Sequence, residues 1–159
     1  MLSTHWAVLH TSQCEPVPLS DRADRFGDGL FETLLWSGSE LVLLDYHRDR
    51  LREGVDRLEL ALPQATIDTF WSDVSHKLRD KVPFESAAVR ISCHRMSQAP
   101  GYATEPQEQA YLSCLVRSQP QHPKLAMSLT VSGIRLGTQP LLAGIKHMNR
   151  LEQVLATRE

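Results

Sequence analysis

The chain has 159 residues, of which 42% are hydrophobic and 23% charged, a composition typical of a soluble globular domain with one sizeable core. Its formal net charge of -2 gives no basic excess for a nucleic-acid backbone or an anionic membrane, and it contains neither a signal peptide nor a run of about 18 apolar residues. The sequence therefore predicts a cytoplasmic protein that binds a small molecule or another protein chain, without a nucleic-acid or membrane partner.

Strand-like segments open the chain. A short apolar run predicts a strand over residues 6–10. Residues 29–36 are rich in Phe, Leu and Thr, and a Ser-Gly-Ser turn separates them from the apolar residues 41–44. This pattern predicts that residues 29–36 and 41–44 form a β-hairpin.

Two amphipathic helices are predicted next. The first covers residues 46–60, has Asp45 as its N-cap and ends before Pro63. The second covers residues 67–78, a span in which four apolar residues share one face of the helix. These residues are Ile67, Phe70, Val74 and Leu78.

The remaining segments predict three strands and a last helix. Strands are expected at residues 87–93, 110–116 and 126–131, which are short and rich in β-branched or apolar side chains. Asn149 is a favourable N-cap for a helix over residues 149–159. Together these elements predict an α+β fold, with a mostly antiparallel sheet and helices on one side.

Several common functional motifs are absent from the sequence. It contains no Walker loop, no Gly-x-Ser-x-Gly elbow, no His-Glu-x-x-His motif and no pair of histidines at i, i+4 spacing. Cys14, Cys93 and Cys114 are widely spaced and form no Cys-x-x-Cys arrangement, so we expect reduced thiols. The sequence therefore predicts no metal site and no disulfide framework.

Lys146 is a candidate for amine chemistry. It follows the apolar residues 141–145 and precedes His147, which predicts an amine at the end of a buried strand. Burial lowers the pKa of an amine toward the range in which it acts as a nucleophile. A lysine at the end of an apolar strand is more often a solvated terminus, so the residues alone leave both interpretations open.

Three segments resemble one enzyme family. Residues 142–155 read Leu-Ala-Gly-Ile-Lys-His-Met-Asn-Arg-Leu-Glu-Gln-Val-Leu and resemble the lysine region of aminodeoxychorismate lyases, which are class-IV pyridoxal-phosphate enzymes. Residues 21–33 are similar to the first fingerprint of that family, and residues 44–51 match its His-x-x-Arg-Leu helix. The resemblance implies the N-terminal part of the fold shared by branched-chain and D-amino-acid aminotransferases.

The resemblance also implies pyridoxal 5'-phosphate as the cofactor and gives roles to particular residues. Lys146 would be the Schiff-base lysine and then the general base, Arg50 would hold the cofactor phosphate, and His47 would orient its neighbours rather than catalyse. Phe31 would line the substrate site, since strand alternation lets only one of Phe31 and Glu32 face inward. Without the resemblance, Arg50 would be interpreted as an ordinary surface arginine.

One segment departs from the family pattern. Residues 91–102 carry Pro100 where the family has an arginine before Gly-Tyr, and Arg95 is the candidate for a displaced cation that binds a substrate carboxylate. The reaction implied by the resemblance converts 4-amino-4-deoxychorismate to 4-aminobenzoate and pyruvate, a step of folate biosynthesis. The family also implies a homodimer.

The expected organisation is an N-terminal α+β domain at residues 1–117, followed by a linker and the start of a C-terminal domain at residues 118–159. Because the rest of that domain has no counterpart in this sequence, we expect weak or no activity of this chain alone. Two alternatives stay open. One is a D-amino-acid or branched-chain aminotransferase that uses the same Lys146, and the other is a non-catalytic α+β interaction domain.

Overall fold

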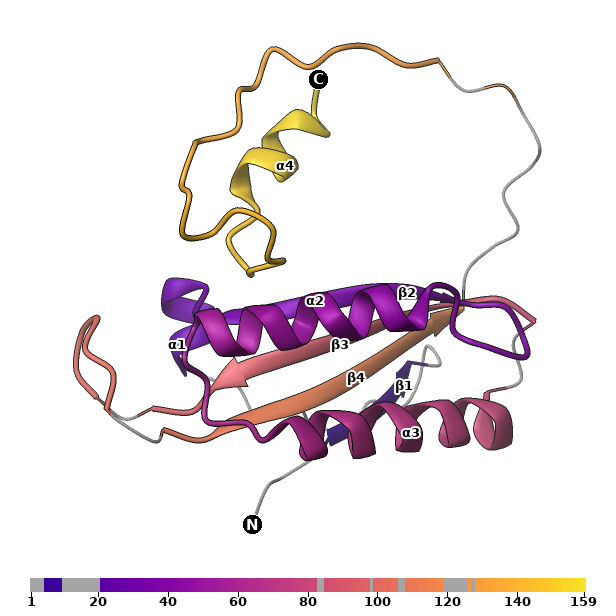
Figure 1. Ribbon diagram of the computed structural model, residues 1–159. Coiled ribbons are helices and arrows are strands. Elements are labelled where there is room, and N and C mark those ends of the chain that lie inside the picture. The colour runs from indigo at the N-terminus through magenta and orange to yellow at the C-terminus, as the bar shows by residue number, and fades with distance from the viewer. Residues whose placement is uncertain are drawn as a thin grey trace.

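The computed structural model describes residues 5–9, 21–82, 85–97, 99–105, 108–118, 126 and 128–159. Its core is a four-stranded sheet in the order β1-β4-β3-β2 (Figure 1). The strands are β1 (His5–Leu9), β2 (Gly29–Trp36), β3 (Ala87–Arg95) and β4 (Ala110–Ser118). The helices are α1 (Asp21–Phe26), α2 (Leu44–Arg57), α3 (Gln64–Lys81) and α4 (Leu151–Ala156).

The sheet is mostly antiparallel, as predicted. β2 and β4 each pair antiparallel with β3, which places Glu32 opposite Ile91 and Ser92 opposite Ser113. β1 pairs parallel with β4 and forms the other edge. The predicted strands at residues 87–93 and 110–116 are confirmed as β3 and β4, and the structure supports the strand near residues 6–10, of which residue 10 lies outside the described part.

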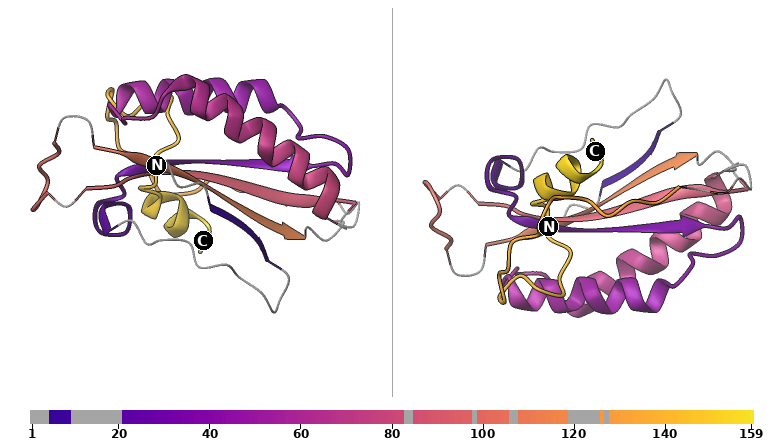
Figure 2. Two further views of the ribbon diagram at one scale, coloured as in Figure 1. Left: turned by 90° about the horizontal axis from the view of Figure 1, so that it is seen from below. Right: turned by 90° about the horizontal axis from the view of Figure 1, so that it is seen from above.

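Helices α2 and α3 cover one face of the sheet, whereas α4 lies on the other side (Figure 2). The covered face and the two helices form one apolar core, because alternate strand residues and one stripe of each helix are buried. Full burial of each large apolar side chain contributes about 1.5–3 kcal/mol. Among the described residues, the most buried members include Leu34, Leu51, Val55, Ile67, Val74, Leu78, Val89 and Ile91.

The predicted second strand of the hairpin is wrong. The chain forms a single bridge from Trp36 to Leu41, and α2 then begins at Leu44. Leu43 has a φ of 57°, in the left-handed region, which turns the backbone from the bridge into the helix. Asp45 consequently lies in the first turn of α2 and is not its N-cap.

The predicted strand at residues 126–131 is also wrong. Residues 126 and 128–131 carry no regular secondary structure, while residue 127 lies outside the described residues. Leu129 and Val131 are 90% and 96% exposed. The described residues include no strand that pairs with this segment, and an apolar sequence without a pairing partner does not make a strand. Within the described part of the chain, no helix combines the length and apolar character needed to cross a membrane.

Candidate functional site

Residues 146–148 run along the outer edge of β2. The Phe31 N–H donates to the Lys146 carbonyl at 2.9 Å, and the Met148 N–H donates to the Gly29 carbonyl at 3.0 Å. An antiparallel bridge between Leu30 and His147 lies between these two bonds. Lys146 is therefore held beside the beginning of β2 by its own backbone.

The segment before Lys146 differs from its prediction. Residues 140–144 form a turn and not a buried strand, and Leu141 is 75% exposed. Ile145 is buried in the core at 6% exposure, and Leu142 is partly buried against it. Lys146 thus owes its position to the bonds with β2 rather than to a strand of its own.

Two glycines, Gly27 in the turn before β2 and Gly29 at the start of β2, let the lysine segment approach closely. Gly27 has a φ of +66°, and a Cβ at this position would lie 2.3 Å from the Asn149 side-chain oxygen. A Cβ at Gly29 would lie 2.6 Å from the Cys93 carbonyl oxygen and 3.0 Å from the Met148 sulfur. Asn149 therefore packs over the turn, and α4 begins later than predicted, with Arg150 as its N-cap.

Three cationic side chains surround the Phe31 ring. The Arg90 guanidinium carbon, the Lys146 Nζ and the Arg150 guanidinium carbon lie 4.0, 4.9 and 5.5 Å from the ring centroid. Cations are attracted to aromatic faces at such distances. The structure thus brings Lys146 and Phe31 together, as the resemblance implied, and adds two arginines that the sequence had not indicated.

The electrostatics of this cluster favour a neutral amine. Burial lowers the pKa of Lys146 below its ordinary value. The charge of Glu32 raises it, whereas Arg50, Arg150 and Arg90 lower it further. Among the described residues, Arg90 and Arg150 form no ion pair, so the cluster carries cations that are available to an anionic ligand.

Arg50 lies on α2 and is held by a carboxylate of β2. The Arg50 Nε donates to Glu32 Oε1 at 2.7 Å, and its Nη2 donates to Oε2 at 2.5 Å. His47 Nδ1 lies 2.6 Å from the same Oε2, so its contact orients the pair, in agreement with the expected role. The hydrogen bond to Glu32 raises the pKa of Arg50. Phe31 and Glu32 point to opposite faces of β2, and Glu32 takes the face covered by helices.

Arg95 lies apart from this cluster. Its Nε donates to Asp28 Oδ2 at 3.0 Å, and its other nitrogens donate to the carbonyls of Leu58 and Glu59. It is 6% exposed and occupies the opposite face of β3 from Arg90. Because these bonds tie β3 to the end of α2, the structure gives Arg95 a structural use and does not place it beside Lys146.

Arg90 and Glu32 are the site residues that sequence reasoning missed. Arg90 belongs to the polar phase of β3, with Ser92 and His94, between apolar residues that enter the core. Glu32 is the single acid in the apolar phase of β2. For Glu32 the available signal was its break in the alternation of β2, whereas Arg90 follows the alternation of β3 and only its place on the open face of the sheet marks it.

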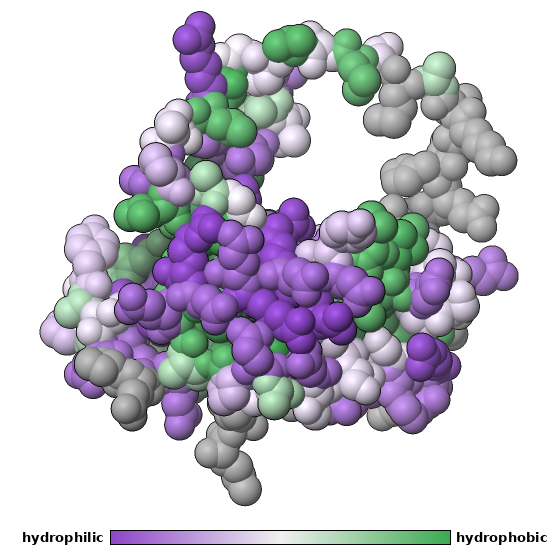
Figure 3. All heavy atoms as spheres, in the orientation of Figure 1, coloured by the Kyte–Doolittle hydropathy of each residue, from purple (hydrophilic) through white to green (hydrophobic). Residues whose placement is uncertain are grey.

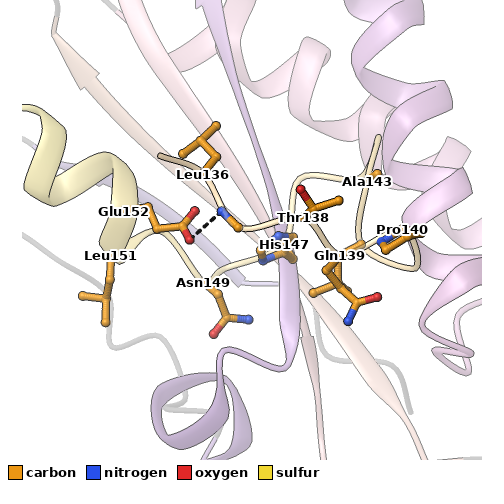
Figure 4. Close-up of a pocket in the computed structure, with 11 residues that line it drawn as sticks. Leu136, Thr138, Gln139, Pro140, Ala143, His147, Asn149, Leu151 and Glu152 are labelled. Atoms are coloured by element: carbon orange, nitrogen blue, oxygen red, sulfur yellow. Dashed lines mark hydrogen bonds between the residues drawn. The ribbon is translucent and has the colours of Figure 1, made fainter. Parts of the chain in front are cut away.

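A pocket of about 700 Å³ adjoins the lysine segment but does not include Lys146. It is lined by residues 136–140, by Leu142 and Ala143, and by His147, Asn149, Leu151 and Glu152 (Figure 4). Glu152 accepts a hydrogen bond from the Gly137 N–H at 2.9 Å. Every lining residue belongs to the one segment 136–152, so the pocket lacks the β2, β3 and α2 side chains that gather around Lys146.

A family model for amino-transferase class IV matches residues 29–159, which contain Phe31, Arg50 and Lys146. The chain belongs to the class IV aminotransferase family. The family model extends over all the elements from β2 to α4. The family membership and the geometry around Lys146 therefore refer to the same residues.

Individual relatives agree with this class IV assignment. An aminodeoxychorismate lyase of Vibrio harveyi is 35% identical over 147 residues, which are 90% of this chain and 52% of the relative. The crystal structure of 4-amino-4-deoxychorismate lyase from Pseudomonas aeruginosa is 32% identical with a TM-score of 0.77, over 92% of this chain and 54% of that one. The chain thus spans about half the length of these relatives.

A branched-chain aminotransferase from Thermoproteus uzoniensis shares the fold. Its TM-score is 0.70 at 20% identity, over 90% of this chain and 50% of that one. This likeness confirms the predicted fold of the branched-chain aminotransferase type. At this identity it carries no information about substrate.

Proposed function

We propose that this class IV chain functions in a pyridoxal-phosphate-dependent lyase that converts 4-amino-4-deoxychorismate to 4-aminobenzoate and pyruvate. The observation that carries the proposal is the Lys146 amine, which has a lowered pKa and lies 4.9 Å from the Phe31 ring within a group of arginines. The two relatives above 30% identity are both named as lyases of this substrate.

The residues present fit the cofactor. Pyridoxal phosphate needs a primary amine for its aldehyde and cations for its phosphate. Lys146 supplies the amine. Arg50 supplies a guanidinium whose Nε and Nη2 are occupied by Glu32, while its Nη1 makes no hydrogen bond among the described residues. When bound, the cofactor takes up the electron pair that is left when the substrate loses a proton.

The substrate carries two carboxylates, and Arg90 is our candidate for binding one of them. Its guanidinium stacks on Phe31 and forms no ion pair within the described part of the chain. Phe31 offers an apolar surface to the substrate ring. Arg95 stays a prediction from the sequence, whereas Arg90 meets the geometric requirement of lying beside Lys146.

Lys146 then acts as the general base. Its neutral amine accepts the proton from the ring carbon that carries the nitrogen, and the C–O bond to the enolpyruvyl group breaks. The enolpyruvyl group leaves as enolpyruvate, which takes up the proton that Lys146 removed and becomes pyruvate. The ring becomes aromatic, and the atoms of the two products together equal those of the substrate. Burial, and after it the nearby arginines, favour this step because they lower the pKa of the Lys146 amine.

Borohydride trapping tests the proposal. Reduction with the cofactor bound should fix the label on the peptide that contains Lys146, and Lys146→Ala should abolish the visible absorption of the lysine-bound cofactor. Lys77→Ala, on α3, is the matched control and should keep both signals. A label on another lysine, or none on Lys146, would refute the assignment.

Product analysis separates the lyase from an aminotransferase, which would use the same Lys146. The lyase releases pyruvate and 4-aminobenzoate, whereas an aminotransferase exchanges an amino group with 2-oxoglutarate. A non-catalytic interaction domain would show neither product and no cofactor absorption. Because the chain spans about half of its relatives, these assays are decisive on a protein that also carries the relatives' remaining length.

Further properties stay predictions from the sequence and the family. They are the homodimer, the cytoplasmic location, the place in folate biosynthesis and the domain division after residue 117. Size measurement in solution, on the same full-length protein, tests the homodimer directly.

A further inference from the structure

Glu32 is a carboxylate inside an otherwise apolar layer. It is 1% exposed and lies on the face of β2 that also carries Leu30 and Leu34. A buried charge is costly unless it is paired and hydrogen-bonded. Glu32 meets that requirement through Arg50 and His47, both of which come from α2.

The geometry of the pair fixes the plane of the Arg50 guanidinium. Two parallel bonds, from Nε and Nη2 to the two carboxylate oxygens, form a fork that a single bond would not provide. The Arg50 side chain is still 38% exposed, and within the described residues its Nη1 has no partner. One edge of the guanidinium is thus anchored in the core, and the other edge remains for an anion.

Glu32 also acts on Lys146 through its charge. The pKa of Lys146 is lowered by burial, raised by Glu32, and lowered by Arg50, Arg150 and Arg90. Among the described residues, Glu32 is the acid that opposes the arginines at this amine. The Glu32 carboxylate therefore acts on both predicted cofactor contacts: it binds Arg50 by hydrogen bonds and affects Lys146 through its negative charge.

We propose that Glu32 is a positioning residue for the cofactor phosphate, acting through the fork that holds Arg50. The inference rests on the proposed function, because it requires that Arg50 bind the phosphate of pyridoxal phosphate. His47 supports the fork by bonding the same oxygen that accepts from Arg50 Nη2. Glu32 itself touches neither the substrate nor the cofactor.

The test compares two ligands that differ by the phosphate, pyridoxal phosphate and pyridoxal. Both ligands carry the aldehyde that reacts with the Lys146 amine. The ratio of the affinity for pyridoxal phosphate to the affinity for pyridoxal therefore measures the contribution of the phosphate contact. Glu32→Gln should reduce this ratio by about tenfold or more, since the neutral amide cannot accept a bidentate, charge-assisted fork. An unchanged ratio in a folded Glu32→Gln protein would overturn the inference.

The same substitution made in an Arg50→Ala variant shows whether Glu32 acts through Arg50. Arg50→Ala should reduce the ratio by itself, and adding Glu32→Gln to it should cause no further loss, because interacting residues are not additive. An undiminished effect of Glu32→Gln in the Arg50→Ala background would contradict the mechanism. If the wild-type protein binds neither ligand, the proposed function is wrong and the inference falls with it. This outcome differs from an unchanged ratio in Glu32→Gln, which contradicts the inference alone.

A second variant, Glu32→Asp, and a measurement without cofactor, the acetylation of Lys146, keep the inference testable if Glu32→Gln does not fold. Glu32→Asp keeps the charge but is one methylene shorter, so it should lose the phosphate preference as Glu32→Gln does. The pH dependence of Lys146 acetylation, measured by peptide mass spectrometry with Lys77 as internal reference, should shift to lower pH in Glu32→Gln and stay near wild type in Glu32→Asp. If Glu32→Asp retains the wild-type phosphate preference, the fork has no positioning role.

Discussion

The proposed function gives Arg90, on the open face of β3, a role in substrate affinity. Its guanidinium lies 4.0 Å from the Phe31 ring centroid and is without an acid partner among the described residues. Arg90→Gln should lower kcat/KM for 4-amino-4-deoxychorismate about 10- to 100-fold, because a hydrogen bond to a charged group contributes about 1.5–3 kcal/mol. Steady-state kinetics on a protein that also carries the relatives' remaining length measure this effect.

The matched control for Arg90 is Arg79→Gln, which changes an exposed arginine of α3. Both variants should bind pyridoxal phosphate like the wild type, since neither removes Lys146 or Arg50. Equal kcat/KM in the two variants would remove Arg90 from the substrate site.

His94 should make the stability depend on acid pH. Burial lowers the pKa of its imidazole from 6.5 to about 4, while Asp24 raises it and Arg90 lowers it. The ring stacks on Tyr111 at 4.7 Å. Below about pH 6.5 His94 is protonated in the unfolded chain, whereas in the folded chain it stays neutral down to about pH 4. Up to about 3 kcal/mol of folding stability is therefore lost as the pH falls from 6.5 toward 4.

His94→Phe keeps the stacked ring and removes the titration. Its free energy of unfolding in urea should fall less than that of the wild type between pH 7 and pH 4.5. His76→Phe changes an exposed histidine of α3 and should retain the wild-type loss. Parallel pH curves for the wild type and His94→Phe would show that His94 does not contribute.

At the scale of elements, the turn before β2 and the lysine segment form one unit. Gly27→Ala would place a Cβ 2.3 Å from the Asn149 side chain and would strain a positive φ. We expect it to cost about 1–3 kcal/mol and to weaken cofactor binding, because Lys146 is displaced with Asn149. Unfolding in urea and cofactor titration give the two quantities.

Gly101→Ala separates the clash from the backbone strain. Gly101 has a similar φ of +62°, but nothing lies within 4 Å of its added Cβ. It should lose stability through strain alone and leave cofactor affinity unchanged. The link between turn and lysine segment would be disproved if both variants weakened cofactor binding equally.

Helices with a strong hydrophobic periodicity could be predicted from the sequence, whereas strands, which need a neighbouring strand to pair with, could not always be predicted. The four apolar residues of α3 at helical spacing are all buried, and Gln64–Lys81 contains the whole predicted span. Residues 126–131 and 41–44 have apolar sequences of the same kind as β3. Among the described residues no strand pairs with 128–131, and residues 41–44 form a single bridge with β2 before α2 begins, so pairing is a property of the fold rather than of the segment.

The site residues also fall into those that the sequence could predict and those that it could not. Lys146, Arg50 and Phe31 were predicted from a specific motif; the Lys146 amine lies 4.9 Å from the Phe31 ring centroid, and the charge of Arg50 acts on it. Arg90 and Glu32 lie on strands where each side chain's face depends on register. That register became known only when Glu32 was found opposite Ile91 and Arg90 opposite Thr33.

The whole molecule is unevenly stabilised. The sheet with α2 and α3 contains the core, and charged side chains gather over α2 on the outside (Figure 3). The segment 128–159 instead exposes large apolar side chains, and its helix α4 has no buried residue. Few buried contacts imply a low free energy of local opening. Hydrogen exchange should therefore be slowest in β3 and fastest in residues 128–144.

Binding of the proposed cofactor should change this distribution, because its two proposed contacts, Arg50 and Lys146, lie on separate parts of the molecule. Arg50 belongs to α2 in the core, whereas Lys146 belongs to the lysine segment at the edge of β2. A ligand at 100 times its dissociation constant stabilises the folded state by about 2.7 kcal/mol. Pyridoxal phosphate should thus slow hydrogen exchange at residues 146–149 and in α2 together, with little change at residues 128–136.

Lys146→Ala provides the control for this coupling. Without the amine, the phosphate can still meet Arg50, so protection should persist weakly in α2 and disappear at residues 146–149. Equal protection of both parts in Lys146→Ala would mean that the ligand binds elsewhere. Protection of residues 146–149 alone in the wild type would mean that Arg50 does not hold the phosphate, since a contact with α2 must reduce the opening of that helix as well.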